Sequence, residues 1–420
     1  MSGGVSQAFT GFSFTDPQYF NDPFPAYEAL LNDHPVAYDP KTNFYLITRY
    51  EDVRAIVLDP TTYSSHGWME AIFQAMDPAR AERIQKRYAE KGWVYGPNVG
   101  FLDDPRHREV RGLFDNALRP AKVKTMEPLI QAVVDRLIGN LAGNKPHEIV
   151  HELADPLPLF VICTQVGAPQ EDIWKIKDWC FQIFKKNSLL LPQVEEMACI
   201  DREIEAQHYF MALIHRLRDR PDGTVLSDII NTPLSDGSPL RDEEALNNLI
   251  YTLFLAGSET TAFATAGGIR LLCEHPGLFT KLKGGSEDEL KLFVEEVLRL
   301  ESPSTGSWRI TTKEVELHGV KIPKGAVIHV RFAAANRDAR QFACPAQLDL
   351  ERKNVRKHMA FGGGIHSCVG STLARTELQI AFRGLFKTFD GVRLAFPDRP
   401  IEYNPHYGFR TLKELYVEFN

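Results

Sequence analysis

Residues 361–370 read FGGGIHSCVG, in which three glycines and a histidine lead to a single cysteine, Cys368. The residues that follow, VGSTLARTELQIAF, have the apolar spacing of a helix, so the cysteine lies close to a helix start. Unpaired N–H groups and the positive end of the helix dipole lower the pKa of a thiol placed there. Glycines let the backbone approach a large flat group. The stretch therefore predicts a thiolate beside a flat ligand.

Three interpretations of this cysteine follow from the residues alone. A single soft thiolate with open geometry suits haem iron better than zinc, which takes three or four protein ligands. A small buried cysteine in a glycine turn is the structural alternative. A phosphate cradle is the third, although the stretch lacks the G-K-[ST] ending and the G-x-G-x-x-G spacing of nucleotide sites.

The composition is that of an ordinary globular protein of 420 residues, and its net charge of -7 argues against a nucleic-acid binder. Six scattered cysteines without a C-x-x-C pair predict a reducing, cytosolic setting. The N-terminal MSGGVSQAFTGFSF lacks the pattern of a signal peptide. The most apolar long window, Leu249–Cys273, contains Glu259 and Arg270, so we expect a buried helix there and no membrane span.

Helical periodicity dominates from about residue 64 to 300 and again over about 360–390. Strand-like alternation is confined to about 35–60 and 303–335. One helix far longer than average is expected from Asp242 to about Cys273, apolar on most sides and running through the core. We therefore expect a mainly α-helical protein with small β-sheets; its length leaves one large domain or two closely packed ones open, and the family resemblance described next implies a single domain over residues 1–420.

FGGGIHSCVG matches F-x-x-G-x-H-x-C-x-G, the signature of the cytochrome P450 family, at every specified position. The chain resembles soluble bacterial members of this family over nearly its whole length. The resemblance implies the cytochrome P450 fold, with the long central helix crossing the core over a haem b. It also implies that Cys368 is the axial thiolate ligand of the iron, with Phe361 beside the sulfur and His366 bonded to a haem propionate. Gly362 and Gly370 would then leave clearance for the porphyrin face.

A second stretch, AGSETT at residues 256–261, lies midway along the expected long helix. Acid and hydroxyl groups are unusual in the buried middle of a helix, and Gly257 costs it about 1 kcal/mol relative to alanine. A local distortion that leaves room for dioxygen and water accounts for both, and a solvent-facing glutamate beside a capping threonine is the alternative. The resemblance implies that Ala256 and Gly257 adjoin the haem, and that Glu259 and Thr260 relay protons for O–O cleavage.

A third element, EEVLR at residues 295–299, contains Glu296 and Arg299 as an i,i+3 pair on one helix face. Alone, such a pair indicates only an everyday ion pair worth about 0.2–0.5 kcal/mol. In the family the pair meets an arginine from the segment before the cysteine, and Arg352 in LDLER matches it. The resemblance implies that this triad is structural and holds the segment that carries the thiolate loop.

A fourth element, DPRHREVR at residues 104–111, resembles the family's D-P-x-x-H-x-x-x-R pattern with one residue fewer before the histidine. His107 and Arg111 are i,i+4 on the expected helix and should face the same way. The two carboxylates of haem need cationic and hydrogen-bonding partners. The resemblance implies that His107, Arg111 and Arg309, in WRITT, bind these propionates; as lone residues they would more often be solvated.

The resemblance implies a monooxygenase that inserts one oxygen atom from O2 into a C–H bond of a small hydrophobic molecule. A terpenoid, an aromatic, a steroid or a fatty acid would suit the apolar residues at the positions that line the family's pocket. No buried cation that would hold a carboxylate is evident in the sequence. The candidate substrate contacts are Trp93, Tyr95, Phe101, Leu253, Thr305 and Trp308.

The chain ends soon after the cysteine helix, so we expect its electrons from a separate ferredoxin with a reductase. We expect a monomer without a nucleic-acid or membrane partner. A haem-thiolate peroxygenase would carry Arg-Pro in place of the acid–threonine pair, and a non-catalytic haem sensor would need a fused effector domain. Basic residues near the cysteine side are candidates for a docking patch, with scattered solvated charges as the alternative: Arg106, Arg108, Arg119, Lys122, Lys124, Arg356 and Lys357.

Overall fold

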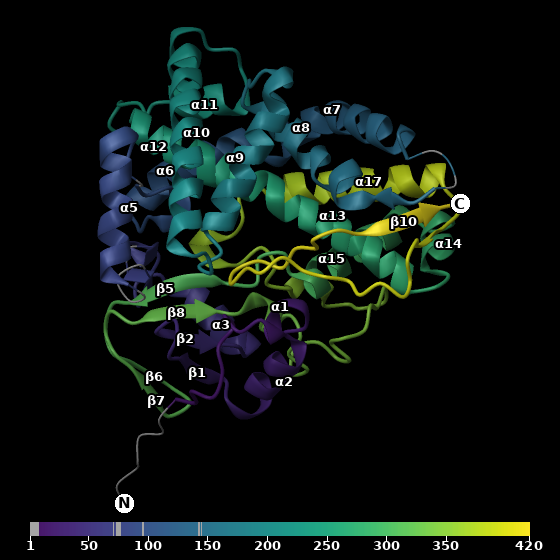
Figure 1. Cartoon of the computed structure of the whole chain (residues 1–420), viewed down its shortest axis with the longest axis horizontal. Coiled ribbons are helices and arrows are strands. Elements are labelled where there is room, and N and C mark those ends of the chain that lie inside the picture. Colours follow the sequence, from purple (N-terminus) through teal and green to yellow (C-terminus); the bar gives the residue numbers. More distant parts are fainter. Residues whose placement is uncertain (1–7, 70, 73–76, 95, 142, 144) are drawn as a thin grey trace, which may run out of the picture.

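The computed structural model describes residues 8–69, 71–72, 77–94, 96–141, 143 and 145–420. The expected mainly α-helical architecture with small β-sheets is confirmed (Figure 1). The helices are α1 Gln18–Asn21, α2 Phe24–Asp33, α3 Tyr50–Leu58, α5 Pro78–Lys91, η1 Val99–Phe101, α6 Arg106–Ala117, α7 Pro120–Gly139, η2 Val150–Ala154, α8 Pro156–Gln165, η3 Gln170–Asp172, α9 Ile173–Lys186, α10 Gln193–Asp219, α11 Val225–Asn231, α12 Asp242–Asn247, η4 Asn248–Leu255, α13 Ala256–Glu274, α14 Leu278–Lys283, α15 Glu287–Glu301, α16 Phe332–Ala335, η5 Val355–Lys357, η6 Gly364–His366 and α17 Ser371–Thr388.

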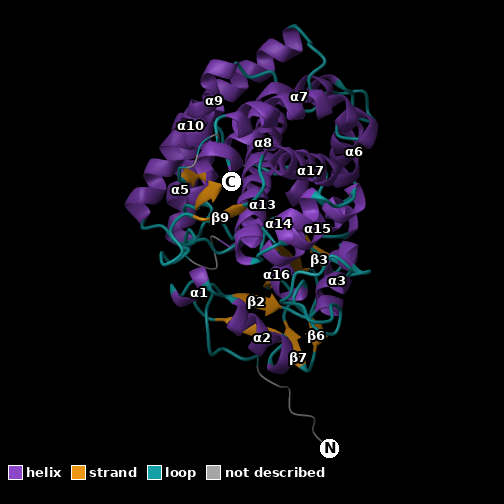
Figure 2. Cartoon of the chain, turned by 90° about the vertical axis from the view of Figure 1, so that its right-hand side faces the viewer, coloured by secondary structure: helices purple, strands orange, loops and turns teal. Residues whose placement is uncertain are grey.

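Small sheets gather at one end of the molecule and beside the C-terminus (Figures 1 and 2). The larger sheet has the order β1-β2-β8-β5-β3, with β2 and β8 parallel and the other neighbours antiparallel. A second sheet has the order β4-β10-β9, and β6 and β7 form a hairpin. The strands are β1 Val36–Asp39, β2 Phe44–Ile47, β3 Tyr63–Ser64, β4 His147–Glu148, β5 Ser307–Thr311, β6 Val315–Leu317, β7 Val320–Ile322, β8 Val327–Val330, β9 Val392–Leu394 and β10 Tyr416–Phe419.

The long helix expected from Asp242 is a continuous run of three pieces, α12, the π-helical η4 and α13. Nearly all of its central residues are buried, because helices pack on several sides of it (Figure 1). Two adjacent glycines of α13 permit side chains of neighbouring helices to lie close to its backbone. A Cβ on Gly267 would lie 2.5 Å from the Glu301 side chain of α15, and one on Gly268 would lie 2.4 Å from the Phe382 ring of α17. These two glycines therefore let α15 and α17 pack directly against the central helix.

Helix α5 lies along α10 at one edge of the molecule (Figure 1). A small separate core joins them, made by Ile84 and Tyr88 from α5 with Ile200 and Ile204 from α10. Ion pairs flank this core, including Arg80 with Glu196 at 2.5 Å. The charged stretch between residues 78 and 91, which reads as a solvated helix, thus uses its charges to attach to a neighbouring helix.

A buried polar cluster continues from this contact toward the centre of the molecule. Lys186 donates to Glu203 and to the hydroxyls of Tyr88 and Tyr251, both at 3.1 Å. Both tyrosine hydroxyls also donate to Glu203, which is fully buried. All three protons of the ammonium are therefore used, and its charge is balanced by one carboxylate.

Candidate functional site

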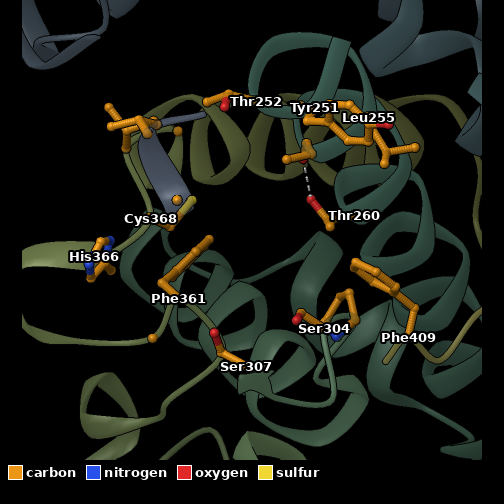
Figure 3. Close-up of a pocket in the computed structure, with 18 of the residues that line it drawn as sticks. Tyr251, Thr252, Leu255, Thr260, Ser304, Ser307, Phe361, His366, Cys368 and Phe409 are labelled. Carbon is orange, nitrogen blue, oxygen red and sulfur yellow. Dashed lines mark hydrogen bonds between the residues drawn. The ribbon is translucent and has the colours of Figure 1, made fainter. Parts of the chain in front are cut away.

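A cavity of about 410 Å³ lies between the central helix, strand β5 and the loop that carries Cys368 (Figure 3). Most of its surface is apolar, with contributions from η1, η4, α13, the segment after α15 and residues 360–374. Cys368, Phe361 and Thr260 all point toward its centre in Figure 3. The fold therefore brings the cysteine stretch and the AGSETT stretch to the same enclosed space.

The glycines of the cysteine loop have two different roles. Gly362 and Gly364 have φ values of 65° and 66°, the left-handed region that glycine tolerates best. A Cβ on Gly364 would lie 2.1 Å from the carbonyl oxygen of Val57, so that glycine allows the loop to dock on α3. Gly362, Gly363 and Gly370 line the cavity, whereas a glycine is required at position 364 because the backbone of α3 lies too close for a side chain. Clearance for a flat ligand thus explains only part of the glycine run.

Cys368 lies three residues before α17, which begins at Ser371. Its backbone N–H donates to the carbonyl of Phe361 at 2.9 Å, and its side chain faces the cavity. Burial raises the pKa of the Cys368 thiol, while the Gly370 N–H and the charges of Arg111 and Arg375 lower it by less. The expectation of a lowered pKa is therefore wrong for the protein alone, because desolvation outweighs the Gly370 hydrogen bond and the two arginine charges. A bound metal would have to supply the charge that holds a thiolate.

Four cationic or hydrogen-bonding side chains gather at the edge of the cavity beside the cysteine loop. The rings of His107 and His366 lie 4.3 Å apart. Arg111 donates to the carbonyls of Ile365 at 3.1 Å and Ser367 at 2.7 Å, so it also holds the loop. Arg111, Arg309 and His366 line the cavity, and His107 lies behind His366.

These side chains leave polar groups unsatisfied. Both ring nitrogens of His366 and Nε2 of His107 are buried without a hydrogen-bond partner among the described residues. Burial, reinforced by the positive charge of Arg309, lowers the pKa of His366 to about 2. Burial likewise lowers the pKa of Arg309 to about 10, and the described residues give it no ion-pair partner. Such a cluster fits a ligand that brings carboxylates to this edge.

The described residues contain no group of three or more histidine, cysteine, aspartate or glutamate side chains arranged to hold a metal ion. Cys368 is therefore the candidate ligand for a metal that arrives with its other ligands already in place. A thiol, a mostly apolar cavity, and arginines with unsatisfied histidine nitrogens at its edge match the chemistry of haem b, which has an iron centre, a flat apolar ring and two carboxylates.

On the central helix, Ala256, Gly257 and Thr260 line the cavity, and the Thr260 hydroxyl donates to the carbonyl of Ala256 at 2.8 Å. Glu259 is buried on another side of the helix, where it accepts from Lys177 Nζ at 2.8 Å. Lys177 also pairs with Asp155 at 3.2 Å. Burial raises the pKa of Glu259, against the opposing charge of Lys177. The acid–threonine pair thus points in two directions, with only the hydroxyl at the cavity.

The candidate substrate contacts divide into three groups. Phe101, Leu253 and Trp308 line the cavity. Trp93 packs elsewhere, with its backbone N–H donating to Gln207, and the buried Thr305 hydroxyl bonds to the carbonyl of Tyr407 at 3.3 Å. Tyr95 lies outside the described residues.

Several cavity residues escape the sequence analysis. Trp68 stacks on Trp308 with ring centroids 4.8 Å apart and meets Phe101 edge-on at 4.5 Å, so three aromatic rings form one wall. Lys186 and Tyr251 line the cavity through the polar cluster described above. Trp68 lies in the stretch SHGWME, where its aromatic side chain is the one sequence feature that could have suggested a place in the cavity wall. Lys186 carries no local signal, because its partner Glu203 lies on the next helix.

The structural triad is assembled as its motif suggests. Glu296 accepts from Arg299 Nε at 2.6 Å and from Arg352 Nε at 3.0 Å, and all three side chains are buried. Arg299 also donates to backbone carbonyls of Asn336, Pro345 and Gln347. The two arginines thus tie α15 to the irregular segment that precedes the cysteine loop.

Comparisons with known proteins agree with this geometry. The family model described as cytochrome P450 matches residues 290–412, which include the Glu296 triad and the Cys368 loop. The chain is 30% identical over 97% of its length to the biotin biosynthesis cytochrome P450 of Bacillus subtilis, covering 98% of that protein. It is 32% identical to a pentalenic acid synthase of Streptomyces avermitilis, over 94% of each protein.

A similar solved structure is P450BioI in complex with an acyl carrier protein ligated to hexadec-9Z-enoic acid. Its TM-score is 0.81 at 28% identity, and the alignment covers 96% of this chain and all of that one. No described helix of this chain is long and apolar enough to cross a membrane. Full-length relatives at 30% identity or more, together with the fold, establish that the chain belongs to the cytochrome P450 family of monooxygenases, whose cofactor is haem b.

Proposed function

We propose that the chain binds haem b through Cys368 and oxidises a small, neutral, hydrophobic molecule with electrons from a ferredoxin-type partner. The observation that carries this proposal is the placement of the Cys368 thiol and the Thr260 hydroxyl on one apolar cavity, with buried histidine nitrogens at its edge that have no hydrogen-bond partner among the described residues. Haem b, when bound, supplies the activation of dioxygen and the insertion of one oxygen atom into a C–H bond. The chain supplies the binding, the orientation and the protons.

Cys368 is the proposed metal ligand, and the reduced, carbon-monoxide-bound spectrum tests it. The wild-type protein should show the red-shifted Soret band of thiolate ligation, because a soft anionic sulfur is the single protein ligand. Cys368→Ala should lose this band. Cys344→Ala, which changes an exposed cysteine, should retain it. A thiolate band that survives in Cys368→Ala would refute the assignment.

His107, Arg111, Arg309 and His366 are the proposed partners of the two haem carboxylates. Arg309 is the most informative of them, because its guanidinium is buried and forms no salt bridge among the described residues, although the charge of Asp103 acts on it weakly. Its burial therefore costs free energy in the protein alone, and a carboxylate would offset that cost.

Arg309→Met should have opposite effects with and without haem. The apoprotein should become more stable to urea, because an uncompensated buried charge is removed. Transfer of haem to an acceptor protein should become about tenfold faster, which corresponds to about 1.4 kcal/mol of lost binding. Arg108→Met, at a side chain that is 82% exposed, is the matched control and should change neither quantity. Unchanged haem transfer in Arg309→Met would contradict the assignment.

Thr260 and Glu259 are proposed to deliver protons in sequence. Glu259 bonds to Lys177, whose side chain is 15% exposed, so this pair can exchange protons with solvent. The Thr260 hydroxyl lies on the cavity side and presents its oxygen to whatever occupies the cavity. A proton would therefore pass from the Lys177–Glu259 pair toward Thr260, through a rotation of the carboxyl or an intervening water.

Thr260→Ala should lower the fraction of electrons recovered in product by about tenfold, while electron consumption continues, because only proton delivery is impaired. Product, peroxide and NADPH consumption are measured with a ferredoxin and its reductase. Thr265→Ala is the control, since this hydroxyl is buried on the same helix and bonds to Thr261. Equal coupling in both variants would exclude Thr260. Failure of every ferredoxin tested to support turnover would exclude that partner class.

The proposed docking patch is weaker in the structure than its sequence suggests. Arg106 pairs with Glu244 at 2.8 Å, Arg108 with Asp104 at 2.8 Å and Lys122 with Asp228 at 3.2 Å. Much of their charge is thus locally neutralised. The ferredoxin proposal therefore rests on the family and on the electron requirement of the reaction.

A neutral substrate is favoured over a carboxylate by the charges around the cavity. Arg111 and Arg309 lie beside the cysteine loop, where the haem carboxylates are proposed to bind. Lys186 also lines the cavity, but its charge is neutralised by Glu203 and its ammonium group donates to three acceptors. The printed names of the relatives include an acid synthase and a protein bound to an acyl-loaded carrier. An ester-linked or otherwise neutral acyl chain remains compatible with such a wall.

Matched dodecanol and dodecanoate test this charge preference. The wild-type protein should bind dodecanol more tightly, measured as the ligand-induced spin-state change of the haem. Glu203→Gln should improve dodecanoate binding about tenfold, because it leaves Lys186 without an anion. Glu205→Gln, an exposed change on the same helix, is the control and should leave both affinities unchanged. Tighter binding of dodecanoate to the wild-type protein would contradict the proposal.

A further inference from the structure

A second polar network lies behind Phe361, away from the residues considered so far. Arg375, on α17, donates from Nε to Glu295 Oε1 at 2.6 Å and from Nη2 to Oε2 at 3.0 Å. His358 contacts the same carboxylate, with Nε2 at 2.9 Å from Oε2. The side chains of Glu295 and His358 are 4% and 1% exposed, and that of Arg375 is 30% exposed. The carboxylate is thus held on two sides in a nearly dry site.

The orientation of His358 is fixed by the backbone. The N–H of Ala360 donates to His358 Nδ1 at 3.2 Å, so that nitrogen is the acceptor. Nε2 therefore carries the proton and donates to Glu295. Burial alone would raise the pKa of Glu295, but the hydrogen bonds from His358 and Arg375 outweigh it and lower the pKa to about 2. Glu295 is consequently an anion throughout the physiological range.

The network places the Arg375 guanidinium over the ring of Phe361. The guanidinium carbon of Arg375 lies 4.4 Å from the centroid of the Phe361 ring. Phe361 lines the cavity, and its carbonyl accepts the N–H of Cys368 at 2.9 Å (Figure 3). Arg375 is also close enough for its charge to act on the Cys368 thiol. The charge on Arg375 therefore reaches the sulfur, and Glu295 is the group that offsets it.

We propose that Glu295 is a positioning residue of the haem site, which holds Arg375 over the Phe361 ring and cancels its charge at Cys368. The inference rests on Cys368 being the haem ligand. Reduction adds an electron to the haem, so an uncompensated positive charge beside the sulfur favours the reduced state. Glu295 keeps the reduction potential low, and Arg375 alone would raise it.

The test is the midpoint potential of the substrate-free holoenzyme, measured by redox titration of its Soret band in the absence of carbon monoxide. Glu295→Gln should favour the reduced state about tenfold, a shift of about +59 mV for one electron. Arg375→Gln should shift the potential in the negative direction, and Arg375→Lys should lie nearer the wild-type value. The double variant should return toward wild type, because both charges are removed together.

The chain provides a matched control between the same two helices. Glu287 on α15 pairs with Arg383 on α17 at an exposed position, so Glu287→Gln removes an equivalent charge far from Phe361. Its potential should equal the wild-type value. A purely structural role predicts that Glu295→Gln and Arg375→Gln reduce stability alike and leave the potential unchanged or shifted in the same direction. Either result overturns the proposal.

The measurements distinguish failure of the proposed haem ligation from failure of the proposed role of Glu295. If the wild-type protein lacks the thiolate band, the haem ligand is misassigned and this inference is overturned with it. If the band is intact but the potentials do not diverge in sign, only the role of Glu295 is refuted. Should Glu295→Gln fail to incorporate haem, Arg375→Lys and Arg375→Gln decide the matter, and equal potentials in these two variants overturn it.

Discussion

One carboxylate, Glu296, is shared by two buried arginines, and the position of the cysteine loop depends on it. Arg299 and Arg352 would each be costly to bury alone, and one anion cannot neutralise both. The balance is made by main-chain carbonyls, since the two guanidinium groups also donate to oxygens of residues 336–347. A segment with little regular structure thereby gains fixed hydrogen-bond partners. The loop that carries Cys368 continues directly from that segment.

The fold class was accessible from sequence because it depends on local patterns, whereas the residues alone left three interpretations of Cys368 and only the family resemblance favoured haem. Helical periodicity predicts the long central run, and the spacing within FGGGIHSCVG places the cysteine before a helix. The Glu296–Arg352 contact joins residues 56 positions apart. It was expected only through family resemblance, because an i,i+3 pair such as Glu296 and Arg299 has no local feature that distinguishes it from a surface pair.

What the sequence could not supply is which side of an element faces which neighbour. Glu259 and Thr260 are adjacent, yet a rotation of about 100° per residue in a helix separates their side chains, and only Thr260 reaches the cavity. Thr305 lies between Ser304 and Gly306, which both line the cavity, but its own hydroxyl donates to the carbonyl of Tyr407. The pKa of Cys368 depends on how far the surrounding fold desolvates the thiol, which no local motif reports. The direction of its shift was therefore predicted wrongly.

The charges around the cavity follow a single arrangement. Lys177 and Lys186 each have buried carboxylate partners, whereas beside the cysteine loop His366 has unsatisfied ring nitrogens and Arg309 forms no salt bridge among the described residues. Uncompensated charge in a buried site is tolerated where a ligand of opposite charge supplies the balance. The lysine charges near the wall proposed to meet substrate are thus balanced by carboxylates of the chain itself. At the edge proposed to meet the cofactor, the balancing carboxylates would come from the cofactor.

Helix α15 links the two networks that surround the cysteine. Its consecutive residues Glu295 and Glu296 differ by about 100° in direction. Glu296 therefore holds the segment before the cysteine, while Glu295 holds Arg375 on the helix after it. Both carboxylates belong to one rigid turn, so neither side of the cysteine loop can shift without breaking a buried ion pair. A loop of mostly small residues is in this way held at both ends by adjacent residues of one helix.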